Sequence, residues 1–157
     1  MRIDIKSRCD IEEMAQKPFA ERTALISIAD WGDEDAELKC LPDFLLRLKF
    51  DDIDGDVFID ELGREPTNAE RKYIEGKYHM LSDKQAKRIA EFYAEIHDNV
   101  DILICQCEHG QSRSAAIAAA ILEYESKSGI DIFINDKYYP NKTIFKKIFK
   151  QLRVTAR

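Results

Sequence analysis

The stretch that most constrains the fold is ILICQCEHGQSRSAAIAAAIL, residues 102–122, in which an apolar run passes through a short polar loop into an alanine-rich run. ILICQ has the length and composition of a buried strand, and SAAIAAAIL is small and apolar on nearly every side, which is typical of a closely packed helix. A buried strand that leads through a short loop into a buried helix predicts an α/β layer protein with a largely parallel sheet.

The rest of the chain continues this alternation of strand and helix patterns. Apolar or alternating runs predict further strands, and amphipathic spacing predicts further helices. The predicted strands lie at 2–6, 22–30, 44–50 and 101–106, and the predicted helices at 11–17, from 82 onward, from 112 or 113 to about 127, and at 142–153. We therefore predict a central, mostly parallel sheet of about four or five strands flanked by helices, with ligands bound beyond the C-terminal ends of the strands.

Residues 51–80 are the least regular part of the sequence, because they are polar and hold three of the six glycines. We predict an insert or long loop at 57–80 with one short helix near Asn68–Glu75, inside one domain that spans 1–157. Long ordered loops in compact domains are often functional.

Net charge and composition limit the kinds of binding partner and the cellular location that we expect. The net charge of −6 gives no support to a nucleic-acid partner, so any affinity for an anion must be local. No run approaches the roughly 18 apolar residues that span a membrane, and the first residues lack the apolar stretch of a secretory signal. We expect a cytoplasmic protein without a membrane partner.

The four cysteines are too sparse and too irregularly spaced for a disulfide scaffold or a zinc site. We therefore predict free thiols at Cys9, Cys40, Cys105 and Cys107.

The polar loop of the opening stretch has the composition of an anion site. Five residues separate Cys107 from Arg113, and a helix N-terminus follows, so that backbone N–H groups and the helix dipole can hold an anion. Gly110 permits a backbone conformation that a side chain would hinder, and Arg113 can bind two phosphate oxygens in a planar fork. Cys107 lies where these positive groups converge, so we expect a stabilised thiolate placed for in-line attack on phosphorus.

The segment Cys107–Ser114 resembles the signature of the cysteine-dependent protein tyrosine phosphatases, in the dual-specificity-like branch. The signature is a cysteine, five residues and an arginine, often followed by serine or threonine, and Gly110 and Ser114 fit it. Two further stretches agree: LRLKFDD resembles the strand that delivers an acidic residue, and YPNKTIFKKIFKQL resembles the opening of the last helix. The resemblance is to a small single-domain member of bacterial type and covers about 23–53 and 82–153.

The resemblance implies hydrolysis of phosphotyrosine or another phosphomonoester in two steps, without a metal or a cofactor. Cys107 attacks phosphorus and becomes phosphocysteine, an aspartate protonates the leaving group and then activates water, and Ser114 donates a hydrogen bond to the sulfur. The implied partners are a phosphorylated protein or a small phosphomonoester, with phosphate or sulfate bound in the loop. The implied phosphate-binding loop consists of Glu108, His109, Gly110, Gln111, Ser112 and Arg113.

The aspartate that acts as general acid is less clearly marked, because four aspartates follow the predicted strand 44–50. Counting from the end of that strand, Asp52 matches the family's acid best, Asp51 comes second and Asp54 third. Asp56 is the fourth aspartate of this group. At least two of the four are expected to belong to a solvated turn.

Gln106 stands where the family usually has a histidine that shapes the loop and stabilises the thiolate. Gln106 can still hydrogen-bond but carries no charge, so an alternative function stays open: a weak or inactive phosphatase-like module that binds phosphate. A rhodanese-type sulfurtransferase is a third and less favoured reading, because that family typically has a loop shorter by one residue.

Three further expectations concern residues around the loop. Asn141 either hydrogen-bonds the loop, as the resemblance suggests, or only caps the last helix. Cys105 is expected to lie in the core. The loop interior has no lysine, whereas phosphatases for polyphosphorylated lipids tend to have lysines there, which favours a phosphoprotein or a small phosphomonoester as substrate.

Overall fold

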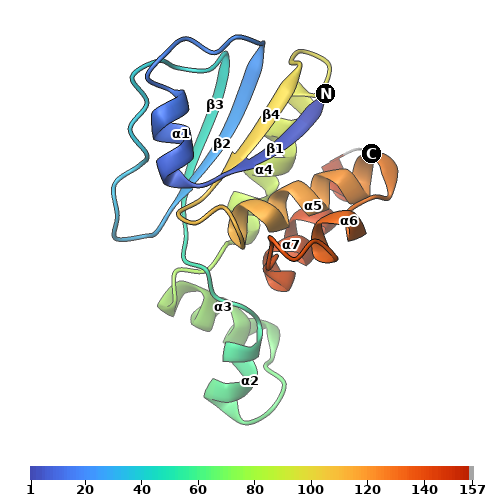
Figure 1. The fold of residues 1–157 in the computed structure, drawn as a ribbon. Coiled ribbons are helices and arrows are strands. Elements are labelled where there is room, and N and C mark those ends of the chain that lie inside the picture. Colours follow the sequence, from blue (N-terminus) through green and yellow to red (C-terminus); the bar gives the residue numbers. More distant parts are fainter. Residues whose placement is uncertain (156–157) are drawn as a thin grey trace.

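The structure is a computed structural model that describes residues 1–155. Four strands form one parallel sheet in the order β1-β4-β2-β3 (Figure 1), which confirms the predicted α/β class and strand direction. The strands are β1 (Arg2–Lys6), β2 (Thr23–Ala29), β3 (Phe44–Lys49) and β4 (Ile102–Gln106). The central strands β2 and β4 are buried along their whole length, as their apolar runs require.

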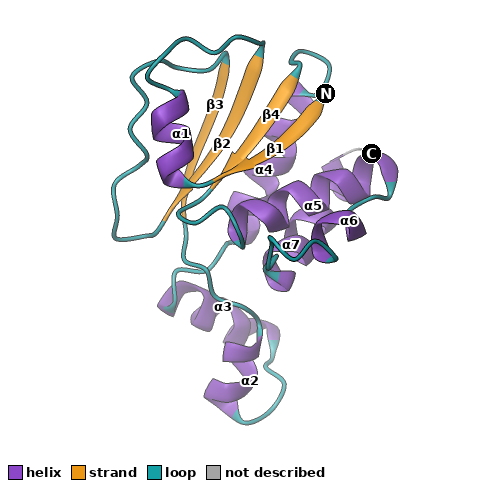
Figure 2. Cartoon of the chain, in the orientation of Figure 1, coloured by secondary structure: helices purple, strands orange, loops and turns teal. Residues whose placement is uncertain are grey.

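Helices cover both faces of this sheet (Figure 2). Three long helices pack with strand residues in the main core on one face, and α1 packs with the segment between β2 and β3 on the other. The helices of these two layers, with the short α6 that follows α5, are α1 (Arg8–Met14), α4 (Asp83–Ile96), α5 (Arg113–Ser126), α6 (Ile130–Phe133) and α7 (Lys142–Thr155). Every residue of α5 from Arg113 to Ile121 is buried, as its small apolar run predicts.

Polar side chains set where the helices begin. Ser82 and Gln85 form the predicted capping box at the start of α4, in which each side chain accepts a hydrogen bond from the other residue's backbone N–H. The first helix begins earlier than predicted, at Arg8 rather than residue 11, because the Ser7 side chain accepts a hydrogen bond from the Asp10 N–H and caps it.

The segment 57–80 differs from its prediction. Instead of a long loop with one short helix, it holds most of α2 (Asp56–Leu62) and all of α3 (Asn68–Lys77), which extend away from the sheet at the bottom of Figure 1. The short helix predicted near Asn68–Glu75 is present as α3, whereas α2 was not predicted. Phe58, Ile74 and Met80 form a small separate core between these helices, and this tertiary packing stabilises them. Of the helices in residues 1–155, none combines the length and apolar composition that a membrane crossing requires.

Candidate active site

The candidate site lies where the C-terminal ends of all four strands meet. Cys107 follows β4, Asp30 follows β2, Asp51 and Asp52 follow β3, and the β1–α1 junction at Ser7 borders the loop. Since the carboxyl ends of parallel strands share one edge of a sheet, the topology brings together residues that are far apart in the sequence.

The Cys107 sulfur faces the first turn of α5. The Ser114 hydroxyl lies 3.1 Å from the sulfur, and the Ser114 backbone N–H donates to it at 3.4 Å. Cys107 itself is only 2% exposed, so these contacts lie in a protected environment. Two groups of one helix N-terminus are therefore placed to stabilise a negative sulfur.

Arg113 is buried with one part of its guanidinium unused. Its Nη1 donates to the Phe50 carbonyl at 2.7 Å and pairs with the Asp30 carboxylate at 2.6 Å. Its Nε has no hydrogen-bond partner, and within residues 1–155 no other buried side-chain nitrogen or oxygen shares this condition. A buried N–H without a partner costs free energy, which a bound acceptor would recover.

The loop between Cys107 and Arg113 rests on the β1–α1 junction. Gly110 adopts a left-handed φ of +67°, and a Cβ added to it would lie 2.7 Å from the Ser7 nitrogen and 2.8 Å from the Lys6 carbonyl carbon. The Arg8 N–H donates to the Glu108 carbonyl at 3.1 Å. The structure thus confirms that this position requires glycine, for its conformation and for its close approach to backbone.

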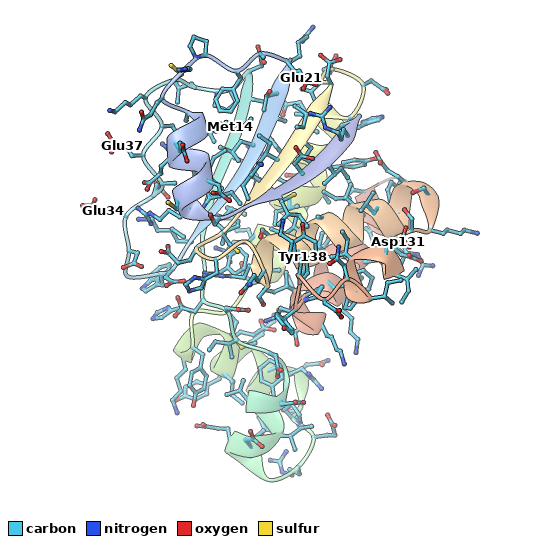
Figure 3. The ribbon with its side chains drawn as sticks, in the orientation of Figure 1. Met14, Glu21, Glu34, Glu37, Asp131 and Tyr138 are labelled. Carbon is cyan, nitrogen blue, oxygen red and sulfur yellow. The ribbon has the colours of Figure 1, made fainter. Side chains whose placement is uncertain are left out.

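The backbone N–H groups of the loop are free donors. Among the hydrogen bonds of residues 1–155, none uses the N–H of residues 108–112. His109 and Gln111 are exposed at the rim of the loop. Outside the loop, the Arg8 guanidinium lies 3.7 Å from the Glu108 carboxylate and donates to the Glu34 carbonyl, which ties the loop to the segment between β2 and β3. Glu34, on that segment, is labelled in Figure 3.

Gln106 is buried and supports the loop through two hydrogen bonds. Its side-chain oxygen accepts from the hydroxyl of Ser27, the residue opposite it on β2, and its side-chain nitrogen donates to the Cys107 carbonyl at 3.1 Å. Gln106 therefore fixes the peptide group that follows the cysteine without adding charge.

Asp52 contacts the loop directly. One of its carboxylate oxygens accepts hydrogen bonds from the Ser112 hydroxyl and from the Asn141 side chain, both at 2.9 Å. Asn141 also donates to the Ile53 carbonyl, and its side-chain oxygen accepts from the Ile144 N–H at the start of α7. Asn141 therefore caps α7, and its side chain fixes the segment that carries Asp52, while its backbone N–H donates to the Ser112 carbonyl of the loop at 3.4 Å.

The neighbouring aspartates have other contacts. The Asp51 carboxylate accepts a hydrogen bond from the Trp31 N–H at 2.9 Å, and the Asp54 carboxylate accepts from the Asp56 N–H at 2.7 Å, at the start of α2. Of the four aspartates after β3, only Asp52 is hydrogen-bonded to the loop among the described contacts.

The other cysteines lie apart from this chemistry. Cys105 is fully buried on β4, and burial raises the pKa of its thiol, so it remains protonated in the core as expected. Cys9 is exposed and Cys40 is half-buried, and all four cysteines are free thiols.

Asp30 is a site residue that sequence reasoning missed. It directly follows the buried strand β2 and pairs with Arg113, 83 positions later in the chain. The sequence signal that could have identified it is its position directly after the strand β2, which is buried along its whole length. The hollow in front of Arg113 has a volume of about 530 Å³, and it is lined by Asp30, Gly32, Asp33, Asp51, Asp52, Glu108, His109 and Arg113.

The fold is shared with solved structures of cysteine-dependent and dual-specificity phosphatases. The chain is similar to Tk-PTP in its active form, with 15% identity and a TM-score of 0.51 over 98% of this chain and 92% of that one. It is similar to human DUSP28, with 14% identity and a TM-score of 0.50 over 98% and 93% of the two chains. A single-substitution variant of human DUSP28 gives 15% identity and a TM-score of 0.53 over 98% and 91%. No protein-family model and no curated protein sequence matches the chain.

Proposed function

We propose that the chain is a cysteine-dependent phosphatase that hydrolyses phosphotyrosine or another phosphomonoester through a phosphocysteine intermediate. The observation that carries this proposal is the buried, unpartnered Nε of Arg113, which lies in one site with the Cys107 sulfur and a loop of free N–H donors. A phosphate dianion offers acceptors for these donors, and its phosphorus would then lie within reach of the thiolate.

In the first step, the Cys107 sulfur attacks phosphorus, so that an S–P bond forms while the P–O bond to the leaving group breaks. Arg113 and the loop N–H groups stabilise the charge on the three other oxygens. Asp52 gives its proton to the leaving oxygen. Because one carboxylate oxygen of Asp52 is held by Ser112 and Asn141, the other oxygen is the one that carries this proton.

In the second step, water attacks the phosphocysteine, and Asp52, now ionised, accepts the proton of the water. The S–P bond breaks, and the Ser114 hydroxyl donates to the departing sulfur, from which it lies 3.1 Å away. This hydrogen bond stabilises the negative charge on the leaving sulfur. Inorganic phosphate leaves, and the site returns to its starting state.

The proposal includes a cytoplasmic location and a phosphorylated protein or small phosphomonoester as substrate. The loop interior has no lysine, and five carboxylates line the hollow in front of Arg113, so multiple phosphates close to the reacting one would be repelled.

The test is release of nitrophenol from p-nitrophenyl phosphate by purified protein in the presence of a chelator. We expect Cys107→Ser to abolish turnover and Arg113→Lys to lower kcat by about 100-fold or more, because lysine keeps the charge but loses the planar fork. Cys9→Ser is the matched control, since it removes an exposed thiol outside the site.

Full activity in Cys107→Ser would sink the proposal. Tight phosphate binding by the unaltered protein without turnover would instead support the phosphate-binding module, for which the uncharged Gln106 is the favouring observation.

A further inference from the structure

A second and larger hollow lies beside the candidate site, between α7 and the α2–α3 segment. Its volume is about 1080 Å³, and we call it the lysine groove. Asp52 lines both this groove and the hollow in front of Arg113, so the two adjoin at the proposed general acid.

One wall of the lysine groove carries like charges at helical spacing. Lys142, Lys146 and Lys150 are exposed on α7 at intervals of four residues, and Lys72 of α3 lines the groove as well. Like charges four positions apart destabilise a helix, so this arrangement has a cost in the free protein. None of these four lysines forms an ion pair among the described residues.

Four of the five carboxylates that line the groove are engaged by other groups, and the exposed Asp56 is the one without a partner among the described contacts. Glu75 and Asp83 both pair with Lys147, at 2.5 and 3.7 Å, and Asp54 accepts a hydrogen bond at the start of α2. The net charge of the whole chain is −6, so a row of unpaired lysines is a local exception rather than a general property of the surface. Such a row attracts an anionic partner to this face.

The spacing of the lysines points to the kind of anion. At about 1.5 Å per residue, the eight positions from Lys142 to Lys150 cover about 12 Å, which matches about four residues of an extended peptide. A compact headgroup would instead favour charges that converge on one point. Phe58, Ile59 and Pro140 add apolar walls that suit side-chain stems.

We propose that the lysine groove binds acidic residues next to the phosphorylated residue of a protein substrate. The proposal rests on the proposed function, because the phosphorylated residue itself would lie at Arg113. It names the substrate class as phosphoprotein segments with two or more carboxylates flanking the phosphorylated side chain.

The test uses fluorescent peptides that carry non-hydrolysable phosphonate analogues of phosphotyrosine or phosphoserine, with acidic, neutral or basic flanks. Binding to the unaltered protein is measured by anisotropy at low and high salt. We expect the acidic peptide to bind at least fivefold more tightly than the neutral one, and 1 M salt to remove this preference because the Debye length falls to about 3 Å. Lys146→Gln/Lys150→Gln should lower the preference about fivefold, as expected for two exposed charge interactions.

The matched control is Lys17→Gln/Lys39→Gln, which makes the same change in net charge with two exposed lysines that do not line the groove. A preference that is lost equally in both double variants would overturn the proposal, as would equal binding of acidic and neutral peptides. Stronger, lysine-dependent binding to vesicles that contain phosphatidylinositol phosphate than to the acidic peptide would also overturn it.

Because binding needs no turnover, these outcomes are separate from the proposed function. A preference for acidic peptides without release of nitrophenol would refute the proposed phosphatase activity and support the proposed role of the lysine groove. Release of nitrophenol without this preference would support the phosphatase activity and refute the role of the groove.

Discussion

Gly110→Ala adds one methyl group where the loop between Cys107 and Arg113 touches the β1–α1 junction. The new Cβ would lie 2.7 Å from the Ser7 nitrogen and 2.8 Å from the Lys6 carbonyl carbon. These are backbone atoms between a strand and a helix, so they cannot turn aside as the end of a flexible side chain could. Either the loop or the junction must move.

Two costs contribute to the expected loss of stability. The left-handed conformation costs a residue with a side chain about 1–2 kcal/mol, and overpacking costs about 1–3 kcal/mol more, so unfolding should become easier by about 2–5 kcal/mol. Gly63 provides the comparison, because its φ is +69° but nothing lies within 4 Å of its would-be Cβ. Gly63→Ala should therefore show only the first cost, about 1–2 kcal/mol.

Urea unfolding of the unaltered protein and both variants measures these losses, and hydrolysis of p-nitrophenyl phosphate measures the effect on the loop. A displacement of about 1 Å at the loop should lower kcat/KM about 100-fold in Gly110→Ala. Gly63 lies outside the site, so Gly63→Ala should retain most of the activity. Equal losses of stability in the two variants would refute the close approach of the loop to Lys6 and Ser7.

Three further predictions concern the proposed acid, the sulfur and helix α3. Asp52→Asn keeps an oxygen that can accept the same hydrogen bonds but carries no proton to deliver, so kcat for phenyl phosphate should fall by about 100-fold or more; a larger loss in Asp51→Asn would assign the acid differently. Ser114→Ala removes the 3.1 Å donor to the sulfur, so the second step should slow about tenfold and phosphocysteine should accumulate in rapid-quench experiments; no accumulation would contradict this role. A hydrogen bond from Arg64 lowers the pKa of Glu70 to about 2 from its usual 4.5, so the stability that Glu70 gives α3 is present above pH 4.5 and is lost as pH falls through 2. Circular dichroism between pH 6 and 1.5 should show a smaller acid-induced loss of helix in Glu70→Gln, and superimposable curves would refute the prediction.

The loop residues could be predicted from the sequence because their geometry is local. Cys107, Gly110 and Ser114 lie within eight consecutive residues of one strand–loop–helix unit, so their spacing largely determines where they can lie. Only one of the two side-chain roles of Asn141 could be predicted from local sequence. Its cap on α7 is local, whereas its hydrogen bond to Asp52 joins residues 89 positions apart.

The remaining features depend on contacts that no local pattern encodes. Asp30 meets Arg113 only because β2 and β4 are neighbours in the sheet. Helix α2 is only seven residues long, and it is stabilised by packing Phe58 against Ile74 of α3. The start of α3 can be predicted from the sequence, because Thr67 and Glu70 have the spacing of a capping box, which the structure contains.

The contact between Gly110 and the β1–α1 junction also sets the order in which the site can assemble. β1 pairs with β4, so that Lys6 lies beside Gln106 across 100 positions of the chain. Contacts of such high sequence separation form late, because closing a long loop costs entropy before the contact can repay it. Until β1 has paired with β4, the loop lacks its contact with Lys6 and Ser7, so the surroundings of Cys107 are complete only after the first strand has joined the sheet.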